Sequence, residues 1–141
     1  MNRKTFLSLV SVIAMSVGTV ALLLPTALLA SKGVAPNPAA NVWAREMGVA
    51  LIAIATVAFL VKGHPDSPTM KAFLIGNAVL QLGLLPIEIA ALANGTLTKL
   101  SGIVPNSVLH IALAAAFAYY ATQIRPASEA ARGSRMSSPE D

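Results

Sequence analysis

The 141-residue chain contains no cysteine and very little charge. The absence of cysteine excludes a disulfide scaffold, thiol redox chemistry, a Cys-ligated zinc and an iron–sulfur cluster. Charged residues make up 11 % of the chain, against about 25 % in a typical soluble domain. A soluble protein of this size has too much surface to cover with so few charges, and 55 % of the residues are apolar. The composition therefore predicts a small integral membrane protein.

Aromatic residues are also scarce, at 5 %, although the formal net charge is +4. The ten lysines and arginines are scattered along the chain, without the basic stripe and interleaved aromatics of a nucleic-acid-binding surface. Gly-rich phosphate loops, HExxH zinc motifs and nucleophile elbows are missing as well. We therefore expect no nucleic-acid partner, no metal and no cofactor, and we favour a non-enzymatic role over an enzymatic one.

Charged residues separate four long apolar segments. No charge occurs at 5–31, 47–61 or 100–124, and only Glu88 interrupts 72–93. A helix of about 20 mainly apolar residues crosses the hydrocarbon core, and these segments are continuously apolar rather than alternating as in a barrel strand. Short connections rich in Gly, Pro and Asn make consecutive helices antiparallel neighbours. The sequence predicts an all-α, up-down four-helix transmembrane bundle as one domain over 1–124, with helices at about 5–29, 43–62, 71–93 and 102–123.

The two ends of the chain carry further signals. Pro25 either kinks the first helix near its end or terminates it at Leu24. The first segment also has signal-peptide features, with Ala27-Leu-Leu-Ala30 as a loose cleavage site, but its apolar run exceeds the about 7–15 residues usual for a signal peptide. We expect it to be retained. Residues 125–141 are rich in Ser, Ala and charge, so we expect a disordered cytoplasmic tail.

Lysine and arginine positions predict the orientation in the membrane, because cytoplasmic flanks carry an excess of them. With the N-terminus inside, the cytoplasmic side holds seven: Arg3, Lys4, Lys62, Lys71, Arg125, Arg132 and Arg135. The outer side then holds three: Lys32, Arg45 and Lys99. Both termini are therefore expected in the cytoplasm.

The third predicted helix carries Asn77, Gln81 and Glu88 at membrane depth. At about 100° per residue these side chains fall within one stripe about 40° wide. The stripe must face other helices or water, because exposure to lipid would cost several kcal/mol. Gly76 and Gly83 share a second face, which suits the close approach of a neighbouring backbone.

Further polar residues lie near the same depth. Asn106 and His110 are one turn apart on the fourth predicted helix, and His110 and Glu88 are each about 10 Å below the outer interface. Arg45 and Glu46 enter from the outer end of the second helix. We predict a polar cluster in the outer half of the bundle, formed by Arg45, Glu46, Glu88 and His110 and backed by Asn106, with Gln81 and Asn77 on the adjoining stripe.

The cluster has two interpretations. An unpaired carboxylate in it would be neutral, whereas pairing with Arg45 or a protonated His110 would keep Glu88 charged. Such groups are suited to proton handling or to orienting a polar ligand. A structural interpretation explains the same residues as interhelical hydrogen bonds, an interfacial ion pair and, for Asn106, a helix cap.

Several short motifs resemble the DoxX-like superfamily of small bacterial membrane proteins, including its uncharacterised DUF4345-type branch. They are Ala-Arg-Glu-Met-Gly at 44–48, Pro-Asn-Ser-Val-Leu-His at 105–110 and Phe-Ala-Tyr-Tyr at 117–120. The resemblance spans about residues 5–122 and implies a four-helix, multi-pass protein of the bacterial plasma membrane. Some members look associated with quinone or thiol systems, and this chain has no cysteine for the latter.

These observations leave several functions open. The first is an accessory or structural subunit, or a binder of a small lipophilic ligand, with the lipid bilayer and a homo-oligomer or larger membrane complex as partners. The second is a proton-coupled transporter that uses Glu88 as its carrier group. The third is a membrane-embedded isomerase resembling the emopamil-binding type, with Glu88 and His110 as acid and base.

Overall fold

The computed structural model describes residues 1–124, which form helices joined by short loops and contain no β-strand. The helices are α1 (Arg3–Leu23), α2 (Pro25–Ser31), α3 (Pro38–Val61), α4 (Pro68–Ala93) and α5 (Leu100–Thr122). All but α2 are long and apolar enough to cross a membrane. The prediction of an all-helical chain with four long apolar helices is confirmed. The predicted tail, 125–141, lies outside the described residues.

The helix bounds differ from the predicted ones where proline begins a helix. Asn37 accepts hydrogen bonds from the amides of Ala39 and Ala40 at 2.9 and 3.3 Å, with Pro38 in the first helical turn. Ser67 accepts one from the amide of Met70 at 3.1 Å, just before Pro68. A polar cap followed by proline starts a helix, because proline lacks only an N–H that would be unpaired there. α3 and α4 therefore begin before the predicted residues 43 and 71.

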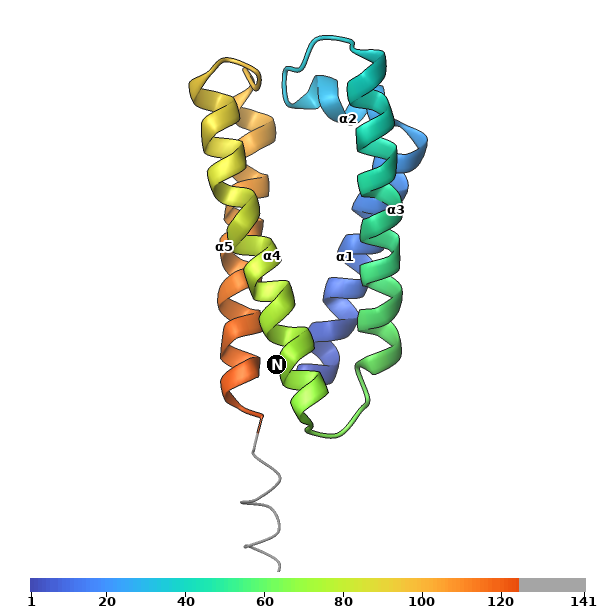
Figure 1. The fold of residues 1–141 in the computed structure, drawn as a ribbon, viewed down its shortest axis with the longest axis vertical. Coiled ribbons are helices and arrows are strands. Elements are labelled where there is room, and N and C mark those ends of the chain that lie inside the picture. Colours follow the sequence, from blue (N-terminus) through green and yellow to red (C-terminus); the bar gives the residue numbers. More distant parts are fainter. Residues whose placement is uncertain (125–141) are drawn as a thin grey trace, which may run out of the picture.

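The prediction of a continuous first helix over 5–29 is wrong. Leu24 leaves the helical conformation, with φ −127° and ψ 47°, and Pro25 begins the separate short helix α2. Of the two alternatives at Pro25, termination at Leu24 is the one observed. α2 then turns toward the side of the molecule on which α4 and α5 lie (Figure 1).

The long helices form two antiparallel pairs, α1 with α3 and α4 with α5 (Figure 1). In the first pair the backbones nearly touch at Gly18 and Gly48. A Cβ built on Gly18 would lie 2.8 Å from the Gly48 carbonyl oxygen, and one on Gly48 would lie 2.7 Å from the Gly18 carbonyl oxygen. The close approach predicted at Gly76 and Gly83 is wrong, because, apart from the local backbone of α4, no described atom would lie within 4 Å of a Cβ at either position.

The two pairs meet at both ends and diverge in between (Figure 1). At the end that holds both Met1 and Ile124, one apolar core joins α1, α4 and α5; its members are Phe6, Leu7, Val10, Met70, Leu74, Ala78, Phe117, Tyr120, Ala121 and Ile124. At the opposite end, the amides of Thr98 and Lys99 donate to the Lys32 carbonyl at 3.1 and 3.2 Å. This second junction places the α2–α3 loop beside the α4–α5 hairpin and positions the site described next.

Candidate functional site

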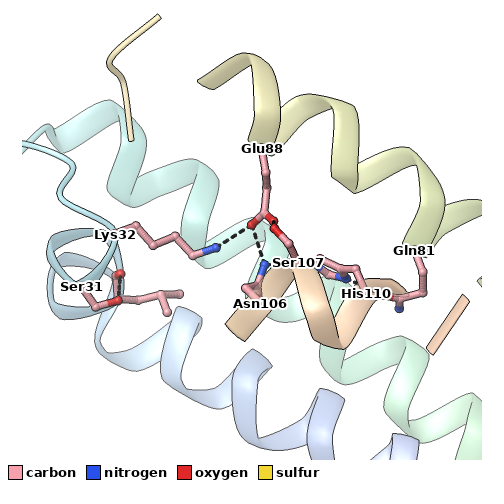
Figure 2. A network of polar contacts seen from close by, with 8 residues as sticks. Ser31, Lys32, Gln81, Glu88, Asn106, Ser107 and His110 are labelled. Atoms are coloured by element: carbon pink, nitrogen blue, oxygen red, sulfur yellow. Dashed lines mark hydrogen bonds and ion pairs between the residues drawn. The ribbon is translucent and has the colours of Figure 1, made fainter. Parts of the chain in front are cut away.

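Glu88 is the centre of a hydrogen-bonded polar network near the junction between α2 and the α4–α5 pair (Figure 2). Its Oε1 accepts from Lys32 Nζ at 2.9 Å and from Asn106 Nδ2 at 2.5 Å, and its Oε2 accepts from Ser107 Oγ at 2.8 Å. Glu88 is only 9 % exposed. Because a buried carboxylate is costly unless it is paired and hydrogen-bonded, this donor set is what the ionised side chain requires.

His110 extends the network along α5. Its Nδ1 lies 2.5 Å from Gln81 Oε1, and its Nε2 lies 2.9 Å from Asn106 Nδ2. An amide oxygen only accepts and an amide nitrogen only donates. The partners therefore assign a neutral ring, with Nδ1–H donating to Gln81 and Nε2 accepting from Asn106.

Helix periodicity explains why these side chains meet. Gln81 and Glu88 lie two turns apart on α4, and Asn106 and His110 lie one turn apart on α5. α4 and α5 are antiparallel neighbours, so their polar faces meet. We call the six residues Lys32, Gln81, Glu88, Asn106, Ser107 and His110 the Glu88 network. It joins three helical segments and leaves no buried side-chain N or O unpaired within residues 1–124.

The structure brings together Glu88, His110, Asn106 and Gln81, as predicted for the cluster. It does not bring Arg45 and Glu46 there: both are exposed on α3, and their side chains make no hydrogen bond or ion pair among residues 1–124. The reason is that α3 packs along α1 and not along α4. Lys32, at the end of the short helix α2, lies beside Glu88 instead.

Asn77 also lies outside the network. It is 8 % exposed, and its Nδ2 donates to the Phe73 carbonyl of its own helix at 2.9 Å. This is a local hydrogen bond, which satisfies a buried amide without an interhelical partner. All three residues of the predicted stripe on α4 are buried, but only Gln81 and Glu88 form hydrogen bonds with α5.

Lys32 and Ser107 are members that the sequence did not single out. In the sequence, Lys32 is the first charge after an apolar segment, which indicates only the end of a membrane span. The turn at Pro25 is what brings it to Glu88. Ser107 directly follows Asn106, which was already predicted to lie on a polar face with His110. This position was the signal from which Ser107 could have been included. α5 begins at Leu100, so Asn106 is inside the helix and not its cap.

The network is partly accessible. The side chain of Lys32 is 21 % exposed and that of Glu88 is 11 % exposed, while Asn106, Ser107 and His110 are half-buried. Part of the surface of these side chains can therefore be reached by a group that approaches from outside. No cluster of three or more His, Asp or Glu side chains that could hold a metal ion occurs within residues 1–124.

A scan against protein-family models, a search of curated proteins and a search of solved structures each found no match. The resemblance to the DoxX-like superfamily therefore stays a prediction, and the Glu88 network is interpreted from its own chemistry.

Proposed function

We propose that the chain is a multi-pass protein of the bacterial plasma membrane with cytoplasmic termini, and that the Glu88 network binds the polar head of a small lipophilic ligand. The membrane placement is supported by the four long apolar helices. Large apolar side chains on these helices point outward, with Leu60 67 %, Val79 64 % and Ile111 56 % exposed. Such a surface suits lipid, since helices satisfy their own backbone hydrogen bonds.

The orientation is supported by two observations. Met1 and Ile124 lie at the same end of the structure (Figure 1), as an even number of crossings requires. Within residues 1–124, the end with Lys62 and Lys71 carries four lysines and arginines against three at the opposite end, which favours the first end as the cytoplasmic one. This orientation places the Glu88 network in the outer half of the membrane.

The hydrogen-bonded chain from the buried Glu88 through the half-buried Asn106 and His110 is the observation that carries the ligand proposal. Interhelical stabilisation accounts for the Lys32–Glu88 pair, which joins the two halves of the molecule. It does not require His110 and Gln81, because apolar side chains could join the already paired α4 and α5 without burying polar groups. Polar side chains at membrane depth usually mark functional sites.

The chemistry of the network restricts the ligand. The positive charge of Lys32 is matched by Glu88, so the network has no net charge with which to hold an ionised head. The hydrogen-bonding capacity left over is that of the Asn106 amide oxygen, the Gln81 amide nitrogen and the Ser107 hydroxyl oxygen, which can recognise hydroxyl and carbonyl groups. The proposal is therefore an uncharged lipid-like molecule with a hydroxyl or carbonyl head.

Mass spectrometry of lipophilic compounds extracted from the purified protein tests this proposal. We expect a compound that accompanies the wild type and is lost from Glu88→Gln and His110→Ala. Glu46→Gln is the matched control, because it makes the same chemical change on an exposed side chain outside the network. Equal retention in all four proteins, or no specific compound in the wild type, would overturn the ligand proposal.

One observation favours a proton-coupled transporter as the second candidate. The Lys32–Glu88 ion pair joins α2 to α4, so a proton on Glu88 would remove a link between the two halves. We would then expect uptake of radiolabelled solutes into proteoliposomes to follow an imposed pH gradient. Glu88→Gln should abolish the uptake and Glu46→Gln should preserve it. Uptake that ignores the gradient rules this candidate out.

A further inference from the structure

A second polar region lies at the opposite end of the molecule, beside the chain termini. A pocket of about 440 Å³ is formed there by the start of α1, the α3–α4 loop and the end of α5. Its charged lining residues are Arg3, Lys4, Lys62 and Asp66, which give a formal charge of +2 with His64 neutral. Excess positive charge in a concave site attracts anions.

The side chain of Arg3 is used to hold the wall of the pocket together. Its Nη1 forms an ion pair with Asp66, and its Nη2 donates to the His64 carbonyl at 2.7 Å. These bonds tie the first turn of α1 to the α3–α4 loop, far away in the sequence. The Arg3–Asp66 pair contributes no net charge, so the excess belongs to the two lysines.

Both lysines are free to neutralise a ligand. The exposed Lys4 makes no side-chain hydrogen bond or ion pair with any residue among 1–124. The ammonium of Lys62 lies 3.3 Å from the centre of the Phe59 ring and makes no hydrogen bond or ion pair within residues 1–124. Tyr119 is 58 % exposed and adds a phenolic hydroxyl to the lining.

We propose that this pocket binds a net-negative phosphate group, carried by a lipid headgroup or by a small soluble phosphoester. Lysine ammonium groups and a tyrosine hydroxyl are donors that suit phosphate oxygens. The pocket lies where the long apolar helices end, and a basic pocket between helix ends at the cytoplasmic surface suits an anionic headgroup. The lipid source rests on the membrane placement proposed above, whereas recognition of phosphate does not.

Calorimetric titration of the detergent-purified chain tests the pocket with three probes: dihexanoyl phosphatidic acid, dihexanoyl phosphatidylcholine and inorganic phosphate. We expect phosphatidic acid to bind more tightly than the zwitterionic phosphatidylcholine. Two lysines near the anion predict a loss of affinity of about 30-fold in Lys4→Gln/Lys62→Gln. Lys71→Gln should not change the affinity, because Lys71 is exposed at the same end but does not line the pocket.

A second variant separates charge from folding. Lys4→Arg/Lys62→Arg keeps both positive charges and should bind phosphatidic acid as the wild type does. Inorganic phosphate that binds as tightly as phosphatidic acid identifies a soluble ligand, and binding of phosphatidic acid alone identifies a lipid. Unchanged affinity in the double glutamine variant, or equal binding of phosphatidylcholine, overturns the proposal.

The same proteins separate this proposal from that of the Glu88 network. The double glutamine variant should retain any lipophilic compound that depends on Glu88, and Glu88→Gln should retain phosphatidic acid binding. Loss of phosphatidic acid binding in Glu88→Gln would contradict an independent pocket at the terminal end.

Discussion

Glu88 and His110 are joined through a single shared group, the side-chain amide of Asn106. Its Nδ2 lies 2.5 Å from Glu88 Oε1 and 2.9 Å from His110 Nε2, so both of its hydrogens are used. A proton on Nε2 would require Asn106 to turn its oxygen toward the ring. That oxygen would then also face Glu88 Oε1, and two acceptors in contact repel each other unless Glu88 carries a proton that it can donate. The protonation states of Glu88 and His110 are therefore linked through Asn106.

Replacing Asn106 by leucine should remove this link. Histidine-selective ¹⁵N NMR should show the Nδ1–H tautomer of His110 in the wild type and a changed tautomer distribution in Asn106→Leu. His64, which lies at the other end of the molecule, supplies an internal reference. We also expect the free energy of unfolding to fall by about 1–3 kcal/mol, because Glu88 loses a donor. Identical His110 spectra in the two proteins would contradict the linkage.

The ion pair across the two halves gives a second prediction. Lys32→Met leaves Glu88 buried with neutral donors only, which should lower the free energy of unfolding by about 1–3 kcal/mol. This range is below that of a fully buried pair because the side chains of Lys32 and Glu88 remain 21 % and 11 % exposed. Thermal unfolding in detergent measures the change.

Two further variants make this test specific to the pair. Lys32→Met/Glu88→Gln should recover most of the lost stability, because no unpaired charge remains. Arg45→Met removes an exposed cation whose side chain has no partner among residues 1–124, and should leave the stability unchanged. A Lys32→Met protein as stable as Arg45→Met would show that the ion pair contributes nothing.

Local signals in the sequence were enough for the four long helices and for two of the three expected pairings between consecutive ones. Apolar runs bounded by charge predict four long helices, and four helices long and apolar enough to cross a membrane are observed, although with other bounds. Asn37-Pro38 and Ser67-Pro68 were interpreted as breaks although they also start helices, which displaced two helix beginnings. The expected packing of consecutive helices is observed for α1 with α3 and for α4 with α5, but α3 does not pack along α4, because a short loop brings two helix ends together without deciding which faces pack along their length.

The same distinction explains the candidate site. Gln81 and Glu88 share one face of α4, and a short hairpin brings that face to Asn106 and His110, so local spacing predicts their meeting. The placement of Arg45 depended on which helices pack together, and it failed for that reason. Lys32 was missed because its position follows from the turn at Pro25, which redirects the chain toward α4.

Close contact at Gly18 and Gly48 gives a third prediction. A methyl group on Gly48 would meet the Gly18 carbonyl at 2.7 Å and the Leu22 amide nitrogen at 2.7 Å, so α1 and α3 would have to separate. We expect Gly48→Ala to lower the free energy of unfolding by about 1–3 kcal/mol. Gly76→Ala is the matched control, since its methyl group meets open space and alanine favours a helix by roughly 0.5–1 kcal/mol. Equal stability of the two variants in thermal unfolding would contradict the close contact.

The absence of cysteine allows the proposed orientation to be tested with single introduced thiols. His64 and Thr96 are exposed in the loops at opposite ends of the structure. In intact cells, a membrane-impermeant maleimide should label Thr96→Cys and should reach His64→Cys only after the membrane is opened. Labelling of both variants in detergent controls for thiol reactivity. The reverse pattern would place the Glu88 network in the inner half of the membrane. Labelling of both thiols from outside would contradict a spanning bundle, because the two loops would then lie on the same side of the bilayer.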